Sequence, residues 1–82
     1  MRRTEIEIIV AILEVAREPI NKTAIVYKTN INFNLARKYL DMLQANSLIE
    51  KNPENKYQIT DKGKSYLQKA KELSQFLGTS SL

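Results

Sequence analysis

The sequence predicts a mostly helical α+β fold built from three helices, a two-stranded hairpin and an amphipathic last helix. The spacing of apolar residues changes twice along the chain: it is helical up to about residue 45, alternating over 48–60, and helical again from residue 61. A chain of 82 residues has room for one hydrophobic core. We therefore expect one domain over residues 1–77, followed by a flexible tail over 78–82.

A first helix is expected over residues 4–17. Thr4 and Glu7 have the spacing of a capping box, in which each side chain accepts a hydrogen bond from the other residue's backbone N–H. The apolar residues that follow recur at helical spacing, at Ile6, Ile9, Val10, Leu13 and Ala16. Glu18-Pro19 ends this helix, because a residue that precedes proline is disfavoured in the helical region. Ile20 is then expected to make a short extended contact.

Two further helices are expected over residues 22–28 and 33–45, separated by the turn Thr29-Asn30-Ile31-Asn32. Asn21 is a good N-cap for the first of them. The second has an apolar side and a polar side, and the polar side contains Asn34, Arg37, Lys38, Asp41 and Gln44. Asn46 is expected to end it in the left-handed conformation. We expect the four tyrosines to pack in the core, because each falls on an apolar face: Tyr27, Tyr39, Tyr57 and Tyr66.

Residues 48–60 are expected to form a hairpin, with Asn52-Pro53-Glu54-Asn55 as its tip. Thr60 or Asp61 then caps a last helix over 61–77. Its apolar residues have the four, three, four spacing of a coiled-coil seam: Tyr66, Ala70, Leu73 and Leu77. This seam needs a cover, which is either the chain's own first helix or a second chain. An amphipathic helix that projects beyond so small a domain favours a homodimer through this helix.

Three helices, a hairpin and a closing helix are the element order of a winged helix, in which the third helix is the recognition helix and the hairpin is the wing. The distribution of charge supports this interpretation. The chain has a net charge of +4, yet its first twenty residues contain three basic and four acidic residues. No acidic residue lies between Glu18 and Asp41. The helix-turn-helix is therefore predicted to be a cationic surface suited to a phosphate backbone.

The candidate DNA-contacting residues lie in the second helix, the third helix and the wing. Arg37 has the paired donors that recognise guanine, and asparagines near the start of the third helix suit adenine. Lysines suit phosphates, so the full set is Asn32, Asn34, Arg37, Lys38, Lys28, Lys22, Lys51 and Lys56. The alternatives are an ordinary solvated helix face and, at the wing, residues that simply favour a turn. Arg2 and Arg3 are either a basic arm or solubilising ends, and Phe33 either touches a thymine methyl or staples the turn.

Composition excludes most chemistry for a small domain. The chain has no Cys and no His, which removes thiolate nucleophiles, imidazole bases and the usual zinc ligands. The remaining carboxylates fall on solvent faces without a partner base. We therefore expect no enzyme activity, no cofactor and no metal site. No apolar run approaches the length of a membrane span, so we expect a soluble protein with no membrane partner. With the DNA-binding interpretation, its expected place is the cytoplasm, in association with the nucleoid.

Several runs of residues resemble a known family. They are Glu5-Ile6-Glu7-Ile8-Ile9, Ala11-Ile12-Leu13-Glu14, Tyr39-Leu40-x-Met42-Leu43 and Tyr57-x-Ile59-Thr60-x-x-Gly63. From about Thr4 to Leu73 the chain resembles the small archaeal winged-helix DNA-binding proteins of the crenarchaeal ten-kilodalton chromatin-associated type. The resemblance implies double-stranded DNA binding as a homodimer, with a recognition helix at residues 33–44 and an antiparallel coiled coil of helices 61–77. This last helix stops before Gly78 and is shorter than the family's usual rod.

The sequence thus predicts a non-enzymatic double-stranded DNA-binding protein. A mixture of Asn, Arg and Gln on the third helix and a modest net charge favour a dimeric transcriptional regulator. The alternatives are an architectural chromatin protein and a winged-helix module that binds protein, because a fold does not by itself determine function.

Overall fold

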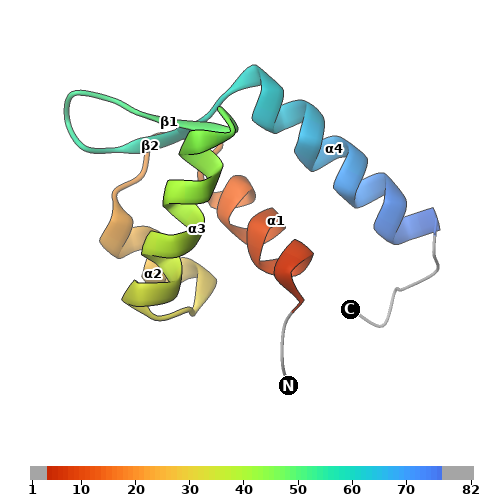
Figure 1. Cartoon of the computed structure of the whole chain (residues 1–82), viewed down its shortest axis with the longest axis horizontal. Helices are drawn as coiled ribbons and strands as arrows, with labels where there is room; N and C mark the ends of the chain where they lie inside the picture. The colour runs from red at the N-terminus through yellow and green to blue at the C-terminus, as the bar shows by residue number, and fades with distance from the viewer. Residues whose placement is uncertain (1–3, 77–82) are drawn as a thin grey trace.

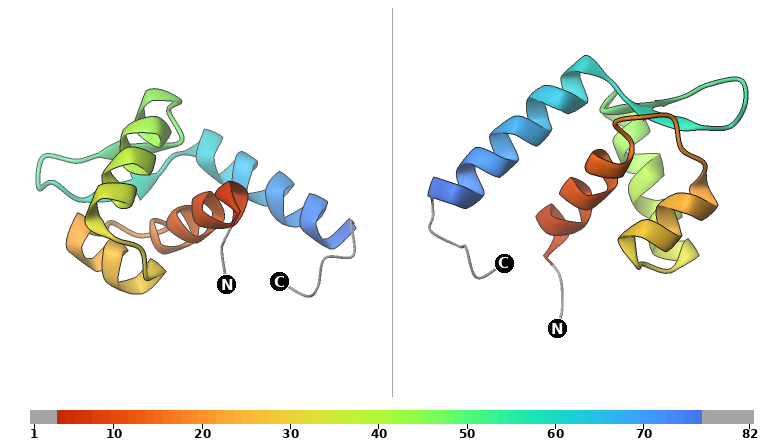
Figure 2. Two further views of the ribbon diagram at one scale, coloured as in Figure 1. Left: turned by 60° about the horizontal axis from the view of Figure 1, so that its bottom comes forward. Right: turned by 180° about the vertical axis from the view of Figure 1, so that it is seen from behind.

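The predicted mostly helical α+β fold is confirmed by a computed structural model that describes residues 4–76 (Figure 1). Arg2, Arg3, Leu77 and the expected tail of residues 78–82 lie outside the described residues. The elements are, in chain order, α1 (Glu5–Val15), α2 (Lys22–Thr29), α3 (Phe33–Ala45), β1 (Ile49–Lys51), β2 (Tyr57–Ile59) and α4 (Asp61–Phe76). Figure 2 shows α1 in the middle of the molecule, between α4 and the pair α2–α3.

Helix α1 begins at the predicted capping box. The Glu7 carboxylate accepts from the Thr4 backbone N–H at 2.8 Å, and the Thr4 hydroxyl accepts from the Glu7 backbone N–H at 3.1 Å. The helix ends at Val15, two residues earlier than expected. The reason is a tertiary hydrogen bond, because the Ala16 carbonyl accepts from the Ile59 N–H at 2.8 Å and leaves the helix to pair with β2.

The ends of α2 and α3 are set by asparagines. Asn21 and Asn32 are their N-caps, and each side-chain oxygen accepts from a backbone N–H three residues later. Asn30 closes α2 in the left-handed conformation, with φ 59°. The prediction that Asn46 adopts the left-handed conformation is wrong. Its φ is −96°, and Ser47 adopts the left-handed conformation instead, with φ 61°.

The end of α3 is a Schellman motif, which explains the one-residue shift. The Ser47 N–H donates to the Gln44 carbonyl at 2.9 Å, and the Leu48 N–H donates to the Leu43 carbonyl at 2.8 Å. This pair of bonds places the left-handed residue after Asn46, whose own side chain donates to the Met42 carbonyl at 2.8 Å. Leu43 and Leu48 are both buried beneath the turn.

The hairpin is antiparallel, with Ile49 opposite Ile59 and Lys51 opposite Tyr57. The predicted tip is confirmed: the Asn52 side-chain oxygen accepts from the N–H groups of Glu54 and Lys56, at 2.9 and 3.0 Å. The second edge of β2 pairs with the segment between α1 and α2. Ile20 and Tyr57 exchange two backbone hydrogen bonds of 2.9 and 2.7 Å, which confirms the expected extended contact at Ile20.

Thr60 joins the hairpin to α4. Its hydroxyl donates to the Ser47 carbonyl at 2.6 Å and accepts from the Gly63 N–H at 2.9 Å, so Thr60 is the N-cap of α4. Its own N–H donates to the Leu48 carbonyl at 3.1 Å. A Cβ atom at Gly63 would overlap that same Leu48 carbonyl and lie 2.7 Å from Cγ1 of Ile59. The first turn of α4 therefore packs directly on the turn that follows α3.

The core lies between α1, α3 and the hairpin, with α4 packed on α1 and β2. Its fully buried large side chains are Ile12, Leu13, Ile25, Leu40, Leu43, Ile49 and Leu67. Tyr39 and Tyr57 are buried and Tyr66 is half-buried, but Tyr27 is 89% exposed, so its predicted burial is wrong. Ile25 and Thr29 occupy the buried side of α2. Tyr27, two residues from each, points to the opposite side because successive residues are about 100° apart in an α-helix.

Glu14 connects the far half of α4 to α1. Its carboxylate accepts from Arg17 Nε at 2.8 Å and also pairs with the Lys71 ammonium. These hydrogen bonds, first from Lys71 and then from Arg17, lower the pKa of Glu14 below its ordinary value. No helix within residues 4–76 is long and apolar enough to span a membrane.

We expect Gly63→Ala to destabilise the protein, although alanine is the better helix former. Alanine gains roughly 0.5–1 kcal/mol in helix propensity. The overlap with a backbone carbonyl costs more, about 3 kcal/mol, because neither the Schellman turn nor β2 can move away without breaking its hydrogen bonds. Thermal unfolding followed by circular dichroism measures the difference. An unchanged or raised melting temperature would contradict the close packing of α4 on Leu48.

We expect Glu14→Gln to lower the melting temperature at pH 7 but not at pH 3. A carboxyl whose pKa is lowered by folding stabilises the native state above its unfolded pKa, roughly 4.3, and loses that contribution as pH falls. Because all three side chains are substantially exposed, the effect is below about 1 kcal/mol. Glu18→Gln, at an exposed carboxylate, is the matched control. Equal differences at both pH values would exclude an ionic contribution from Glu14.

Candidate nucleic-acid interface

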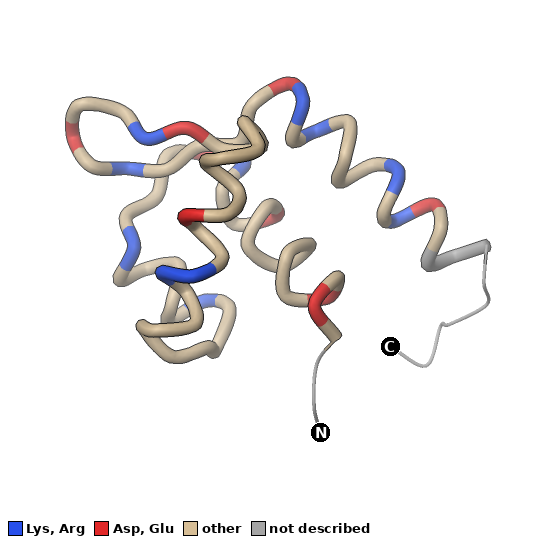
Figure 3. The backbone as a smooth tube through the Cα atoms, viewed as in Figure 1, with Lys and Arg blue, Asp and Glu red and all other residues tan. Residues whose placement is uncertain are grey.

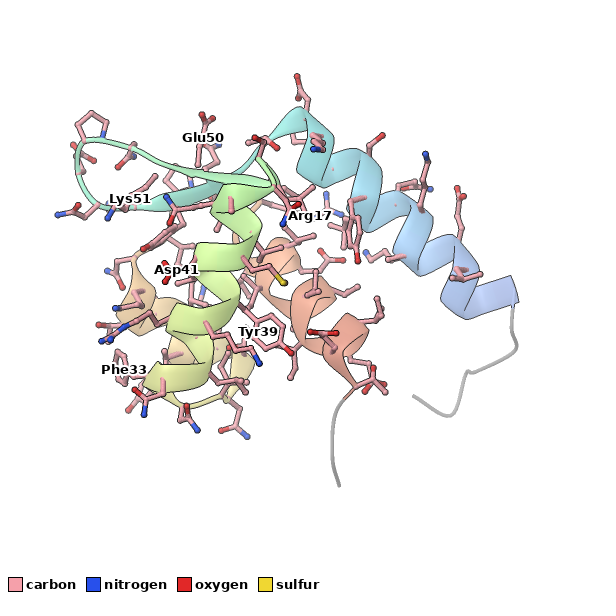
Figure 4. The ribbon with its side chains drawn as sticks, viewed as in Figure 1. Arg17, Phe33, Tyr39, Asp41, Glu50 and Lys51 are labelled. Carbon is pink, nitrogen blue, oxygen red and sulfur yellow. The ribbon has the colours of Figure 1, made fainter. Side chains whose placement is uncertain are left out.

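Helix α3 presents a polar face on the side opposite the core. Ala36, Tyr39, Leu40 and Leu43 are buried, and they follow one another at helical spacing. The exposed residues of the opposite side form what is called here the outer face of α3: Asn34, Arg37, Lys38 and Asp41. Figure 4 shows Tyr39 on the α1 side of the helix, with Asp41 on the other side. The expected division of α3 into a packed side and a polar side is therefore present in the structure.

The cations of this surface have no acidic partner within the described residues. Both ion pairs in residues 4–76 use the Glu14 carboxylate, on the far side of the core. The unpaired cations of α2, α3 and the wing are therefore Lys22, Lys28, Arg37, Lys38, Lys51 and Lys56; Lys62, Lys64 and Lys69 of α4 form no ion pair in these residues either. Asp41 lies one turn from Arg37 but forms no ion pair with it in these residues. Figure 3 shows the asymmetry in charge: α1 contains only acidic charged residues and α2 only basic ones.

The two asparagines at the start of α3, Asn32 and Asn34, differ in which side-chain hydrogen-bonding groups are free to bind a ligand. The Asn32 side-chain oxygen accepts from the Leu35 N–H at 2.7 Å, so it is committed to capping the helix. Only the amide NH2 group of Asn32 remains for a ligand. Asn34 lies in the first turn of α3 and is exposed. The hydrogen-bond geometry thus makes Asn34 the better candidate of the two for pairing with an adenine edge, which needs both a donor and an acceptor.

Lysines of α2 and the wing lie in the same half of the molecule as α3, away from α4 (Figure 3). Lys28 is exposed at the end of α2, whereas Lys22 is half-buried at its start. At the wing, Nζ of Lys51 lies 5.8 Å from the centre of the Tyr57 ring, a cation–π contact that orients the side chain (Figure 4). Lys56 is exposed and lies between the hairpin tip and β2. Lys38 makes a similar contact, 5.7 Å from the Tyr39 ring.

Two exposed aromatic side chains lie on either side of the turn between α2 and α3. Tyr27 is 89% exposed, and Phe33, which opens α3, is 49% exposed. Figure 4 labels the Phe33 side chain at the start of α3. The exposure of Phe33 leaves open both expected roles, a contact with a thymine methyl and a staple of the turn, whereas Tyr27 was expected in the core. The signal that identifies it is the helical position of Ile25: a residue two places from the buried position of a short helix faces solvent.

The expected seam of α4 is only partly covered. Tyr66 and Ala70 are half-buried, Leu73 is 58% exposed, and Leu77 lies outside the described residues. The residue of α4 that enters the core is Leu67, next to the seam. Helix α1 therefore covers one side of α4 and leaves the apolar side chain of Leu73 in solvent.

The described residues offer mainly hydrogen-bond donors and cations on this surface. Within residues 4–76 no three His, Cys, Asp or Glu side chains gather into a group that could hold a metal ion. The groups that do gather are amide and ammonium donors and a guanidinium, all suited to phosphates and base edges.

Comparison with known proteins agrees with this geometry. A family model described as winged helix-turn-helix matches residues 2–77. MJ0287, an uncharacterised protein of Methanocaldococcus jannaschii, is 33% identical over 79 residues, which are 95% of this chain and 80% of that protein. The crystal structure of Sso10a-2, a DNA-binding protein from Sulfolobus solfataricus, is similar with a TM-score of 0.73 and 28% identity, over 96% of this chain and 90% of that one.

These similarities confirm the expected resemblance to small archaeal winged-helix proteins. The family model extends over nearly the whole chain, and the elements that it requires are those that the structure contains: a helix-turn-helix made by α2 and α3, and a wing made by β1 and β2. The chain belongs to the winged helix-turn-helix family.

Proposed function

We propose that this protein binds double-stranded DNA and has no enzymatic activity, and that it acts as a dimeric transcriptional regulator on the DNA of the nucleoid. The observation that carries the proposal is the outer face of α3, where Arg37 and Lys38 have no carboxylate partner within the described residues. Uncompensated cations on a recognition helix are the electrostatic signature of a surface that meets phosphates. The DNA-binding Sso10a-2, similar over almost its whole length, supports the same function.

In this proposal α3 lies in the major groove with its N-terminal half closest to the bases. Arg37 donates two hydrogen bonds to a guanine edge, and Asn34 pairs with an adenine. The lysines contact phosphates: Lys38 from α3, Lys28 and Lys22 from α2, and Lys51 and Lys56 from the wing. Asn32 positions α3 as its N-cap and contributes its remaining NH2 group to the same strand.

The composition of the outer face of α3 favours a regulator over an architectural protein. A protein that coats DNA needs mainly cations, since it contacts phosphates and bends the duplex without reading bases. This chain has a net charge of only +4. Two of the four residues on the outer face, Asn34 and Arg37, have the side chains that distinguish base pairs.

A homodimer through α4 is part of the proposal. Leu73 is 58% exposed at the end of a seam whose other described residues, Tyr66 and Ala70, are half-buried. A second copy of α4 would cover this seam, and a dimer would present two recognition helices to one duplex.

The double variant Arg37→Ala/Lys38→Ala is expected to lose duplex affinity by at least tenfold and to keep its melting temperature, because both side chains are exposed. Fluorescence anisotropy with a labelled duplex measures the affinity over a series of salt concentrations. The slope of log affinity against log salt should fall by about 0.9 for each lost phosphate contact.

Lys64→Ala/Lys69→Ala is the matched control for that experiment, since it removes the same charge from exposed positions on α4. It is expected to weaken binding only slightly. Equal losses for the two double variants would mean that net charge, and not α3, governs affinity. An absence of duplex binding by the unmodified protein at low salt would refute the proposed function and favour a winged helix that binds protein.

Leu73→Glu is expected to convert the dimer into a monomer without unfolding the chain, because Leu73 is largely exposed within one subunit. Sedimentation equilibrium measures the molecular mass in solution. Ser65→Glu, which adds the same charge at an exposed position of α4, is the control and should remain dimeric. A monomeric unmodified protein, or a dimeric Leu73→Glu variant, would exclude a dimer through this seam.

A further inference from the structure

We propose that Tyr27 is a DNA-contacting residue in its own right, and that its hydroxyl donates a hydrogen bond to a backbone phosphate beside the groove that α3 occupies. This inference rests on the proposed function and adds to it a contact that is neutral in charge. Tyr27 lies in the last turn of α2. Among the residues that the sequence predicts to contact DNA, only Lys28 lies in this turn.

The exposure of Tyr27 has no explanation within the fold. Its side chain is 89% exposed, the highest value among the exposed large hydrophobic residues of the described chain. The buried side of α2 is completed by Ile25 and by Thr29, whose hydroxyl donates to the Ile25 carbonyl at 2.6 Å. Tyrosine is also a mediocre helix former. Packing and helix propensity therefore give no reason for a tyrosine at this position, whereas exposed tyrosines are common in binding surfaces.

The position of Tyr27 is fixed by hydrogen bonds around the turn. The Asn30 N–H donates to the Val26 carbonyl at 2.9 Å and closes α2, and Asn32 then caps α3. Only residues 30–32 separate the two helices. Tyr27 and Phe33 are thus exposed at the two ends of a short, capped turn, at the N-terminal end of the helix that enters the groove.

The neighbours of Tyr27 indicate what kind of partner it meets. The exposed residues that follow it are basic, amide or aromatic, and they continue onto α3: Lys28, Asn30, Asn32, Phe33, Asn34, Arg37 and Lys38. No acidic residue occurs between Glu18 and Asp41. A protein partner would be expected to meet a wider apolar patch. A polyanion fits this surface better, and tyrosine hydroxyls are among the groups that donate to phosphate oxygens.

The pair Tyr27→Phe and Tyr27→Ala tests the contact. Loss of one hydrogen bond to a charged oxygen is expected to weaken duplex binding about tenfold for Tyr27→Phe. Because a neutral hydroxyl releases no counterion, the slope of log affinity against log salt should stay that of the unmodified protein, whereas Lys28→Ala should reduce it by about 0.9. Tyr27→Ala should be weakened at least as much as Tyr27→Phe. The melting temperatures should not change.

Ser65→Ala removes a hydroxyl from an exposed position of α4 outside the seam and is the control, expected to bind as the unmodified protein does. A duplex series with one neutral methylphosphonate at a time locates the phosphate. At one position the substitution should weaken the unmodified protein but not Tyr27→Phe, since the two changes remove the same hydrogen bond.

The outcomes separate the two proposals. If the unmodified protein binds duplex DNA and Tyr27→Phe binds equally well, the proposed function stands and the phosphate contact of the Tyr27 hydroxyl is refuted. A loss seen only with Tyr27→Ala would assign the ring and not the hydroxyl, and would overturn the phosphate contact. If the unmodified protein does not bind duplex DNA, both proposals fall.

Discussion

The carbonyl of Leu48 is the point on which the arrangement of α3, the wing and α4 depends. It accepts from the Thr60 N–H at 3.1 Å, and the Cα of Gly63 packs against it so closely that no side chain fits there. The Thr60 hydroxyl completes the junction by donating to the Ser47 carbonyl and capping α4. Because Ser47 and Leu48 form the turn that ends α3, the recognition helix, the hairpin and α4 meet at one hydrogen-bonded point.

The hairpin and α4 are held to the rest of the molecule by different contacts. The hairpin is attached on both sides, to the end of α3 through Leu48 and to the α1–α2 segment through Ile20. The outer face of α3 and the cations of the wing thus belong to one body, as a surface that meets a rigid duplex requires. In the far half of α4, Ala70 is half-buried, Leu73 is 58% exposed, and Lys71 forms an exposed ion pair with Glu14 of α1, a weak interaction in water.

Local patterns in the sequence were sufficient for the element order and the caps. A capping box, two N-cap asparagines and a turn-rich hairpin tip are each decided by neighbouring residues, and each is present in the structure. The two mistakes have different causes, a distant contact at the end of α1 and a local pair of backbone bonds at the end of α3. Helix α1 ends early because Ala16 pairs with β2, and the left-handed residue after α3 is Ser47 because two backbone bonds form a Schellman motif.

The candidate site was predictable in its charges but not in its details. Helical spacing placed Arg37 and Lys38 on an exposed face, and they are exposed there. Helical spacing does not predict that the side-chain oxygen of Asn32 accepts a hydrogen bond as the N-cap of α3. In a helix as short as α2, two buried residues define the inner side, so an apolar pattern alone misplaced Tyr27.

The central claim is that α3, the end of α2 and the wing bind one face of a DNA duplex. Amide chemical shifts of the isotopically labelled protein, followed by NMR as duplex DNA is added, test it most directly. The account predicts that the largest changes fall on residues 27–44 and 51–56, with small changes on the middle of α1 and on the exposed side of α4. Changes concentrated on α4, with α3 unaffected, would contradict it.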